Sequence, residues 1–279
     1  MAISRRTFLG GIVVGLATVR SRSLLHARSH VKRYARFRYR NQVAYGLLEQ
    51  DTIHELSGSI FAKPIQTGKT YSLQDVKLLT PCQPTKVLAV GLNYGSHLGD
   101  RPKPKNPELF FKSPSSVLEP EGTIIIPPGT QDCHYEGELV IVIAKKAKSV
   151  SVDNAPAYIL GVTCGNDVSA RDWQRNDLQW WRAKGSDTFA CLGPTIAAGI
   201  NYNDLLLTTR LNGAIKQQQR TSDLIFNVET IVSFASQFIT LLPGDVIYTG
   251  TPGRTTAMKP GDVVEIEIEG IGVLRNRVA

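Results

Sequence analysis

The stretch HYEGELVIVIA, residues 134–144, joins two glutamates to a run of apolar, mostly β-branched residues. Side chains alternate between the two faces of a strand, so Glu136 and Glu138 share one face, about 6 to 7 Å apart along the backbone. Apolar residues continue both faces, which predicts a strand buried on both sides. Two carboxylates at the end of such a strand raise each other's pKa unless a cation lies between them.

A third carboxylate follows a second apolar run. AYILGVTCGND, residues 157–167, ends in Asp167, again where a buried strand emerges. Spacing alone also fits carboxylates exposed to water at a strand end, the usual environment of Glu. Three carboxylates from two strand ends, however, suit a hard cation in octahedral geometry. We therefore predict that Glu136, Glu138 and Asp167 bind one Mg²⁺ or Mn²⁺ ion and leave coordination positions for water or substrate.

The rest of the chain predicts a mixed, β-dominated fold. From Lys86 onward, short β-branched runs and Pro-Gly turns are interrupted by two predicted helices, SARDWQRNDLQWWRAK (169–184) and NVETIVSFASQFITLL (227–242). In the second helix, one face is predicted to be buried, and it consists of Ile231, Phe234, Ala235, Phe238 and Ile239. This pattern favours a barrel or a folded-over sandwich and disfavours a doubly wound parallel sheet, because strands and helices do not alternate.

The domain organisation follows from turns and prolines. Residues 31–84 alternate strand-like runs with Gly, Asn and Asp turns, which predicts a small β-rich N-terminal domain. Pro81 and Pro84 mark its boundary with a second, larger domain over residues 85–279.

The net charge of +8 belongs to the amino-terminal arm. Residues 1–40 hold ten of the 32 Lys and Arg residues and no Asp or Glu, so the remainder is slightly acidic. No basic patch interleaved with aromatic residues recurs later, and we expect no nucleic-acid partner.

Residues 1–30 resemble a twin-arginine signal. SRRTFLG (4–10) precedes an apolar stretch of about ten residues, well short of the roughly 20 that span a bilayer. An export receptor would read a short set of residues, namely Arg5, Arg6, Phe8 and Leu9. We expect a protein exported to the periplasm without stable membrane insertion. The alternative is a basic start to a cytoplasmic enzyme, because the cleavage site near Ala27 is a poor match.

The four cysteines stand far apart, without a C-x-x-C pair. Single cysteines beside apolar neighbours are usually buried packing residues. Nothing in the spacing of Cys82, Cys133, Cys164 and Cys191 therefore indicates a disulfide or a zinc site.

Six ordered motifs resemble the fumarylacetoacetate hydrolase family, over about 70% of the chain from Lys86 to the carboxyl end. They are VLAVGLNYGSH (87–97), HYEGELVIVI (134–143), GNDVSARDWQ (165–174), RAKGSDTFACLGP (182–194), LPGDVIYTGTPG (242–253) and KPGDVVEIEIEGIGVLRNRV (259–278). The resemblance implies a β-roll catalytic domain with few helices and a homodimer.

The resemblance also implies roles for single residues. The metal ligands would be Glu136, Glu138 and Asp167. Arg171, Gln174, Lys184 and Thr251 would contact the substrate, and Lys184 would also act in catalysis. His97 would be the catalytic histidine, and Asp100 stands where acylpyruvate-hydrolysing members carry its glutamate partner.

These roles predict a divalent-metal-dependent hydrolase that cleaves a carbon-carbon bond of a small anionic 2-oxo acid, of the acylpyruvate or fumarylpyruvate type, through a metal-stabilised enolate. Because Asp100 stands in place of that glutamate, the alternatives within the family are a decarboxylase, an isomerase or hydratase, and a ureidoglycolate lyase. A non-catalytic metal-binding protein with the same fold is the alternative from another class.

Overall fold

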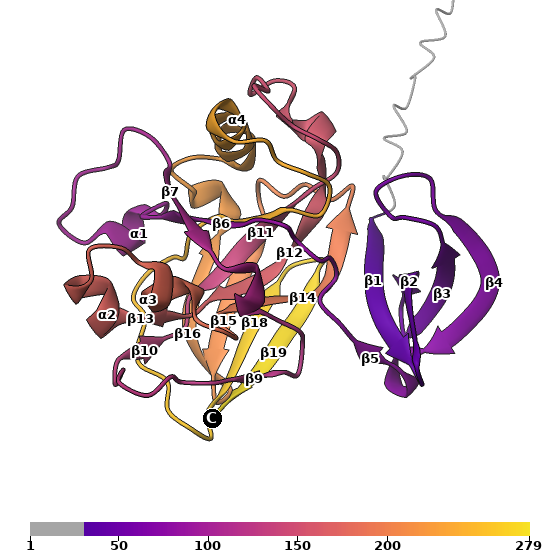
Figure 1. Ribbon diagram of the computed structural model, residues 1–279, viewed down its shortest axis with the longest axis horizontal. Coiled ribbons are helices and arrows are strands. Elements are labelled where there is room, and N and C mark those ends of the chain that lie inside the picture. Colours follow the sequence, from indigo (N-terminus) through magenta and orange to yellow (C-terminus); the bar gives the residue numbers. More distant parts are fainter. Residues whose placement is uncertain (1–30) are drawn as a thin grey trace, which may run out of the picture.

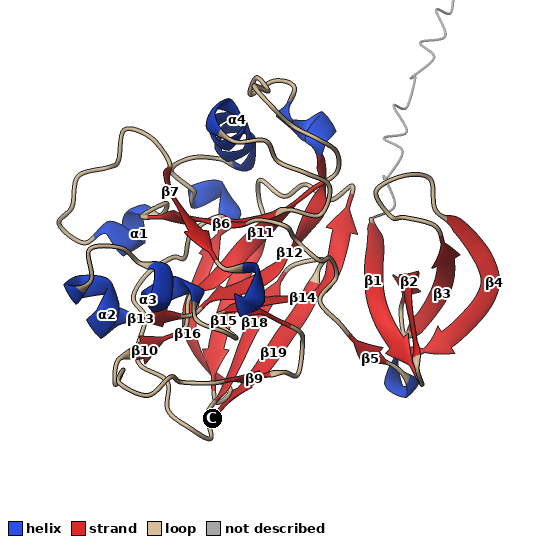
Figure 2. Cartoon of the chain, viewed as in Figure 1, coloured by secondary structure: helices blue, strands red, loops and turns tan. Residues whose placement is uncertain are grey.

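The computed structural model describes residues 31–279, and the predicted twin-arginine leader lies outside these residues. Within them the chain is dominated by strands, with four short α-helices (Figure 2). The strands are β1 (Lys32–Tyr39), β2 (Gln42–Glu49), β3 (Thr52–Ser57), β4 (Ile65–Ser72), β5 (Lys77–Leu78), β6 (Val87–Gly91), β7 (Glu108–Lys112), β8 (Val117–Leu118), β9 (Thr123–Ile124), β10 (Cys133–His134), β11 (Gly137–Ile143), β12 (Ile159–Asp167), β13 (Ser169–Ala170), β14 (Ala190–Ala198), β15 (Leu206–Leu211), β16 (Ala214–Arg220), β17 (Val246–Tyr248), β18 (Val263–Ile268) and β19 (Gly272–Val278). The α-helices are α1 (Gly95–Leu98), α2 (Arg171–Asn176), α3 (Trp181–Gly185) and α4 (Val228–Phe238). Four 3₁₀ turns are η1 (Leu73–Asp75), η2 (Pro114–Ser116), η3 (Ala155–Tyr158) and η4 (Thr221–Asp223). The β-dominated fold predicted from the sequence is confirmed.

One large sheet contains strands from both the N-terminal region and the main body of the described chain. Its order is β4-β3-β2-β1-β14-β12-β11-β17-β6-β7, with β5 and β8 joined at the side. The N-terminal strands form the compact unit at the right of Figure 1, and they join the main body where β1 pairs antiparallel with β14. The small β-rich region is therefore hydrogen-bonded to the main body through its first strand.

A second sheet, in the order β16-β15-β18-β19-β9, packs against the large one. The strand β11 lies between two apolar clusters. Leu139, Ile141 and Ile143 belong to the main core with residues of β15 and β18, whereas Val140 and Val142 belong to a second cluster. Every residue of β11 is buried, so the prediction of a strand buried on both faces is confirmed.

The predicted helix over residues 169–184 is wrong as a continuous helix. Ser169 and Ala170 pair with β10, α2 ends at Asn176, and α3 starts only at Trp181. The side chain of Asp177 holds the break, because it accepts hydrogen bonds from Arg182 Nε at 2.5 Å and Arg182 Nη2 at 2.7 Å. Two short helices with a bend between them can direct Arg171 and Lys184 to one place, which a straight helix of this length cannot.

The second predicted helix exists but is shorter. Asn227 caps α4 by accepting a hydrogen bond from Thr230 N at 3.0 Å. Its carboxyl end stops before Leu241, which pairs with Ala147 as a β-bridge. Ile231 and Ala235 are buried as predicted, together with Val228 and Val232, but Phe238, also predicted to be buried, is 71% exposed.

No helix within residues 31–279 is long and apolar enough to cross a membrane.

Candidate metal centre and catalytic pocket

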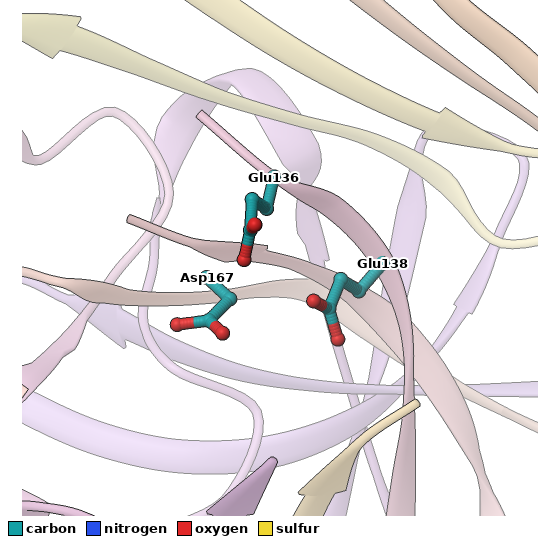
Figure 3. Close-up of side chains that lie close together, drawn as sticks. All are labelled: Glu136, Glu138 and Asp167. Carbon is teal, nitrogen blue, oxygen red and sulfur yellow. The ribbon is translucent and has the colours of Figure 1, made fainter. Parts of the chain in front are cut away.

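Three carboxylates meet at the ends of two paired strands. Glu138 lies on β11, Glu136 directly precedes it, and Asp167 ends β12. One oxygen of each lies within 4.8 Å of the others, and at most 4% of each residue is exposed. Figure 3 shows the three side chains converging from neighbouring ribbons. The structure thus brings together the three residues that the sequence suggested as metal ligands.

Backbone pairing fixes this convergence. Asp167 N donates to Glu136 O at 2.9 Å, and Glu136 N donates to the side-chain oxygen of Asn166 at 2.8 Å. In the antiparallel register Gly137 faces Asn166 and Glu138 faces Gly165. The positions of the carboxylates are therefore set by the strand ladder and do not depend on a flexible loop.

Gly137, between the two glutamates, has to be small. Alternation directs this position away from the carboxylates and toward the second sheet, where a Cβ atom would lie 2.0 Å from Thr209 Oγ1. The E-G-E pattern thus places the ligands on one face while the other face approaches β15 closely.

Glu138 receives a backbone donor from the turn after β17. Gly250 N donates to Glu138 Oε2 at 2.7 Å. Gly250 has a φ of 101°, and a Cβ there would lie 2.8 Å from Asn93 Cβ, so only glycine fits. The turn TGTPG therefore serves as a donor to the carboxylate site.

Three cations surround the carboxylates. Lys184 Nζ donates to Glu136 Oε2 at 2.5 Å and to Asp167 Oδ2 at 2.7 Å. Arg171 Nη2 donates to Glu136 Oε1 at 2.5 Å. Lys112 Nζ donates to Asp167 Oδ1 and to the backbone oxygen of Lys184. All six side chains are buried or nearly so, and the three positive charges match the three carboxylates in number.

Sequence reasoning missed Lys112. The available signal was a lysine closing the apolar strand ELFFK, the same arrangement as the glutamates beside β11. The side chain of Lys112 is fully buried, and it ties β7 to both Asp167 and Lys184. Lys112 therefore belongs to the inner structure of the site.

The pKa values of the site differ according to the neighbours. Burial, followed by the charges of Asp167 and Glu136, raises the pKa of Glu138 well above its usual range. Burial acts in the same direction on Glu136, but Arg171, Lys184 and His97 outweigh it and hold its pKa well below the usual range. For the lysines, burial lowers the pKa of Lys112, whereas at Lys184 the charges of Asp167 and Glu136 outweigh burial and raise the pKa. Glu136, with its lowered pKa, accepts hydrogen bonds from two cations, whereas Glu138, with its raised pKa, accepts from a backbone N–H.

The residues present fit a hard divalent cation. The donors are carboxylate oxygens only, which Mg²⁺ and Mn²⁺ prefer over nitrogen or sulfur. Among the described residues, moreover, Glu138 has a backbone N–H as its single hydrogen-bond donor and faces two further carboxylates, so a dication would offset its charge. A metal held by Glu136, Glu138 and Asp167 agrees with this chemistry.

His97 lies at the rim of the carboxylate site. Its Nδ1 is 2.5 Å from Gly253 O, and its Nε2 is 3.8 Å from Glu136 Oε1. A carbonyl oxygen only accepts, so Nδ1 carries the proton and, in the neutral ring, Nε2 offers a lone pair to the site. Asp100 lines the same pocket but, within residues 31–279, forms no hydrogen bond or ion pair with His97. The structure does not show the predicted dyad.

The residues predicted to contact the substrate surround the same pocket. Arg171 begins α2 and donates through Nη1 to Gln174 at 2.8 Å, so these two side chains lie side by side. The hydroxyl of Thr251 donates to Gly137 O at 2.9 Å and accepts from Gln217 Nε2 at 2.8 Å. Because its single proton is engaged, this hydroxyl cannot donate to a substrate carboxylate in this arrangement.

The pocket has a volume of about 1090 Å³. Its inner wall carries the carboxylates and Lys184, and its outer part is lined by arginines and by apolar groups such as Trp180. All nine residues that the sequence suggested for the site line this pocket, namely His97, Asp100, Glu136, Glu138, Asp167, Arg171, Gln174, Lys184 and Thr251.

Comparison with known families gives two matches that together span the described chain. Residues 86–279 match the family described as fumarylacetoacetate (FAA) hydrolase C-terminal. Residues 32–81 match the family described as Rv2993c-like, N-terminal.

Known relatives carry several activities. A mitochondrial oxaloacetate tautomerase of Rattus norvegicus is 41% identical over 217 residues, which cover 73% of this chain and 69% of that protein. The crystal structure of a 5-carboxymethyl-2-hydroxymuconate delta-isomerase from Mycobacterium smegmatis is 42% identical, with a TM-score of 0.85 over 88% of this chain and 99% of that one. A maleylpyruvate hydrolase from Sphingobium, in complex with manganese(II) and pyruvate, is 26% identical, with a TM-score of 0.74 over 88% and 98% of the two chains.

Proposed function

We propose, from the premise that this chain belongs to the fumarylacetoacetate hydrolase family, that it is a divalent-metal-dependent enzyme that interconverts the keto and enol forms of a 2-oxo acid. Oxaloacetate is the first substrate to test, because a relative of 41% identity is named for its tautomerisation. The observation that carries the choice of reaction is the hydrogen bond between His97 Nδ1 and Gly253 O.

Glu136, Glu138 and Asp167 would hold the metal ion, as Mg²⁺ or Mn²⁺. When bound, a divalent cation supplies Lewis-acid stabilisation of the negative charge that develops on the keto oxygen of the substrate.

His97 is the proton carrier in this proposal. Its Nε2 faces the pocket, and the contact of Nδ1 with Gly253 O fixes the tautomer in which Nε2 can accept a proton. It takes a proton from the carbon next to the keto group, which breaks a C–H bond, and the proton returns to the oxygen as an O–H bond. The reaction needs no water and no further reactant.

The inner cations keep the ligands in place. Lys184 holds one oxygen of Glu136 and one of Asp167, and Arg171 holds the second oxygen of Glu136. They also attract the anionic substrate, because they are buried in a region where charges interact strongly. Arg171 and Gln174 lie next to each other and together can receive the substrate's oxygens.

Hydrolysis of an acylpyruvate is the second candidate. It is favoured by the structural similarity to a maleylpyruvate hydrolase. Hydrolysis requires activation of water, for which a His paired with a carboxylate is better suited because the carboxylate stabilises the imidazolium. His97 instead contacts a backbone carbonyl, and this contact supports tautomerisation over hydrolysis.

The test follows the ultraviolet absorbance of enol-oxaloacetate after EDTA-treated enzyme receives Mg²⁺ or Mn²⁺. We expect metal-dependent loss of the enol and a fall of about 10²- to 10⁴-fold in kcat for His97→Gln, the usual contribution of a general base. Acetylpyruvate, fumarylpyruvate and ureidoglycolate, together with pyruvate release from oxaloacetate, distinguish hydrolysis, lyase activity and decarboxylation. Fast cleavage of an acylpyruvate without tautomerase activity would overturn the choice of reaction, and stoichiometric binding without turnover would support the non-catalytic alternative.

The proposed location is the periplasm, reached by a twin-arginine route. Paired Arg5 and Arg6 before a short apolar stretch support it. The intact mass of the protein recovered from its own cells tests this proposal. Removal of the leader during export lowers this mass by the mass of the residues removed, whereas a cytoplasmic enzyme keeps the mass of the full chain.

A further inference from the structure

Two arginines stand at the outer part of the pocket and take no part in holding the metal site. We infer that Arg254 and Arg101 bind a second carboxylate of the substrate, so that the enzyme selects 2-oxo acids with two carboxylates. This inference rests on the proposed function and names the substrate class for it.

The position of Arg254 is fixed by its two neighbours. Gly253 O contacts His97 Nδ1 at 2.5 Å, and Thr255 Oγ1 accepts from Arg171 Nη2 at 3.0 Å. The Arg254 side chain therefore starts between the proposed base and the arginine that holds Glu136. Its long side chain can reach a group on the part of the substrate that points away from the carboxylates.

Both guanidinium groups are free to bind an anion. Arg254 and Arg101 line the pocket and are exposed, and within residues 31–279 neither forms an ion pair or a side-chain hydrogen bond. Arg175, which lines the same pocket, is already paired with Asp132 at 2.9 Å. Asp100 is a carboxylate of the same rim, but it is not within ion-pair distance of either arginine.

The charge of the inner site also favours two negative charges on the ligand. The three carboxylates are matched by Lys112, Lys184 and Arg171, so a bound dication adds a double positive charge. A substrate with one carboxylate balances only half of it, whereas a dicarboxylate balances it fully.

Size alone cannot select the substrate. A volume of about 1090 Å³ lies at the upper end of the range for drug-sized ligands, and a four-carbon acid fills only a small part of it. Selection therefore has to come from polar contacts, and a carboxylate bound by a planar guanidinium is the strongest contact available at this rim.

The experiment compares two ligands that cannot enolise, 3,3-difluorooxaloacetate and 3,3-difluoro-2-oxobutanoate. They share the 2-oxo acid and the CF₂ group and differ only in a carboxylate against a methyl group. Their dissociation constants are measured by calorimetry on the full Mg²⁺-loaded chain, for wild type, Arg254→Gln, Arg101→Gln and the matched control Arg175→Gln.

We expect wild type to prefer the dicarboxylate and each of Arg254→Gln and Arg101→Gln to weaken its binding by about tenfold or more, the usual effect of losing a charge-assisted hydrogen bond. Binding of the monocarboxylate should change less than about twofold, and Arg175→Gln should leave the preference as in wild type. The inference would be overturned if wild type bound both ligands equally or bound neither measurably. It would also be overturned if Arg254→Gln kept the wild-type preference for the dicarboxylate. The dissociation constants are measured without turnover, so they test this inference separately from the proposed function. A protein that does not turn over oxaloacetate can still show the predicted preference for the dicarboxylate, and an active protein can lack it.

Discussion

At the scale of single residues, the site is a balance of buried charges. Glu136 has two cationic donors and a lowered pKa, while Glu138 has one backbone donor and a raised pKa. The sequence predicted the carboxylates because each ends an apolar run. It did not predict Lys112, because only the pairing of β7 with β6 in three dimensions brings that lysine to Asp167. Sequence spacing alone does not show which charged residues of distant strands form ion pairs in the fold.

Replacing Lys112 tests this balance. Lys112→Met removes one cation and leaves Asp167 in a group of buried carboxylates, so we expect the free energy of unfolding in EDTA to fall by about 3 kcal/mol, as when one member of a buried pair is lost. Saturating Mn²⁺ should reduce this loss, because the dication offsets the same carboxylates. Urea unfolding with and without metal measures both effects.

The control for this variant is Lys148→Met, since Lys148 Nζ donates to Gln237 O at the exposed surface. Its free energy of unfolding should stay within about 0.5 kcal/mol of wild type. A Lys112→Met protein as stable as wild type in EDTA would contradict the assignment of Lys112 to the charge balance.

The cysteines give a second prediction at this scale. All four are free and buried, and burial raises the pKa of Cys82 and of Cys133 to about 12, with Cys164 and Cys191 shifted in the same direction. Thiolate is the reactive form, so the native protein should not react with a disulfide reagent at pH 8. Four thiols should be titrated after unfolding in guanidinium, and rapid reaction of the folded protein would show that a thiol is accessible.

At the scale of elements, two features place the site. The pairing of β11 with β12 sets the ligands opposite each other, and the break between α2 and α3 turns Arg171 and Lys184 toward them. Periodicity predicted the strands correctly, since both faces of β11 are apolar. It failed at residues 169–184, where Asp177 accepts hydrogen bonds from Arg182 at the break between the two helices, a contact that periodicity does not reveal.

Gly137→Ala tests the packing of β11 on the second sheet. A Cβ atom would lie 2.0 Å from Thr209 Oγ1, so β11 has to shift. We expect a loss of about 1–3 kcal/mol in the free energy of unfolding, typical of overpacking, together with weaker metal binding. The double variant with Thr209→Ala should be more stable than the sum of the single changes predicts, because the two residues are in contact.

Gly95→Ala is the control for that substitution. Nothing lies within 4 Å of a Cβ atom at Gly95, so its stability should remain near that of wild type. Strict additivity of Gly137→Ala and Thr209→Ala would contradict the close approach of β11 and β15.

At the scale of the whole molecule, one sheet connects a small N-terminal unit with the catalytic body, and the pocket opens where β11, β12 and the turn after β17 meet α2 and α3. The fold class could be predicted because alternation and turn residues are local signals. The strand β4 could not, since IQTGKTYS is polar and mostly exposed and is held by pairing with β3. The partner of His97 could not be predicted either, because Gly253 is brought to it by the fold from more than 150 positions away.

The central claim is that Glu136, Glu138 and Asp167 together hold one divalent cation. Calorimetric titration of EDTA-treated protein with Mn²⁺ tests it most directly, in wild type, Asp167→Asn and Glu138→Gln, with circular dichroism to verify folding. We predict one equivalent of Mn²⁺ bound by wild type and binding weakened by at least about tenfold in both folded variants, because each loses a charged ligand. Binding of Mn²⁺ by a folded Asp167→Asn protein with the affinity of wild type would contradict the claim.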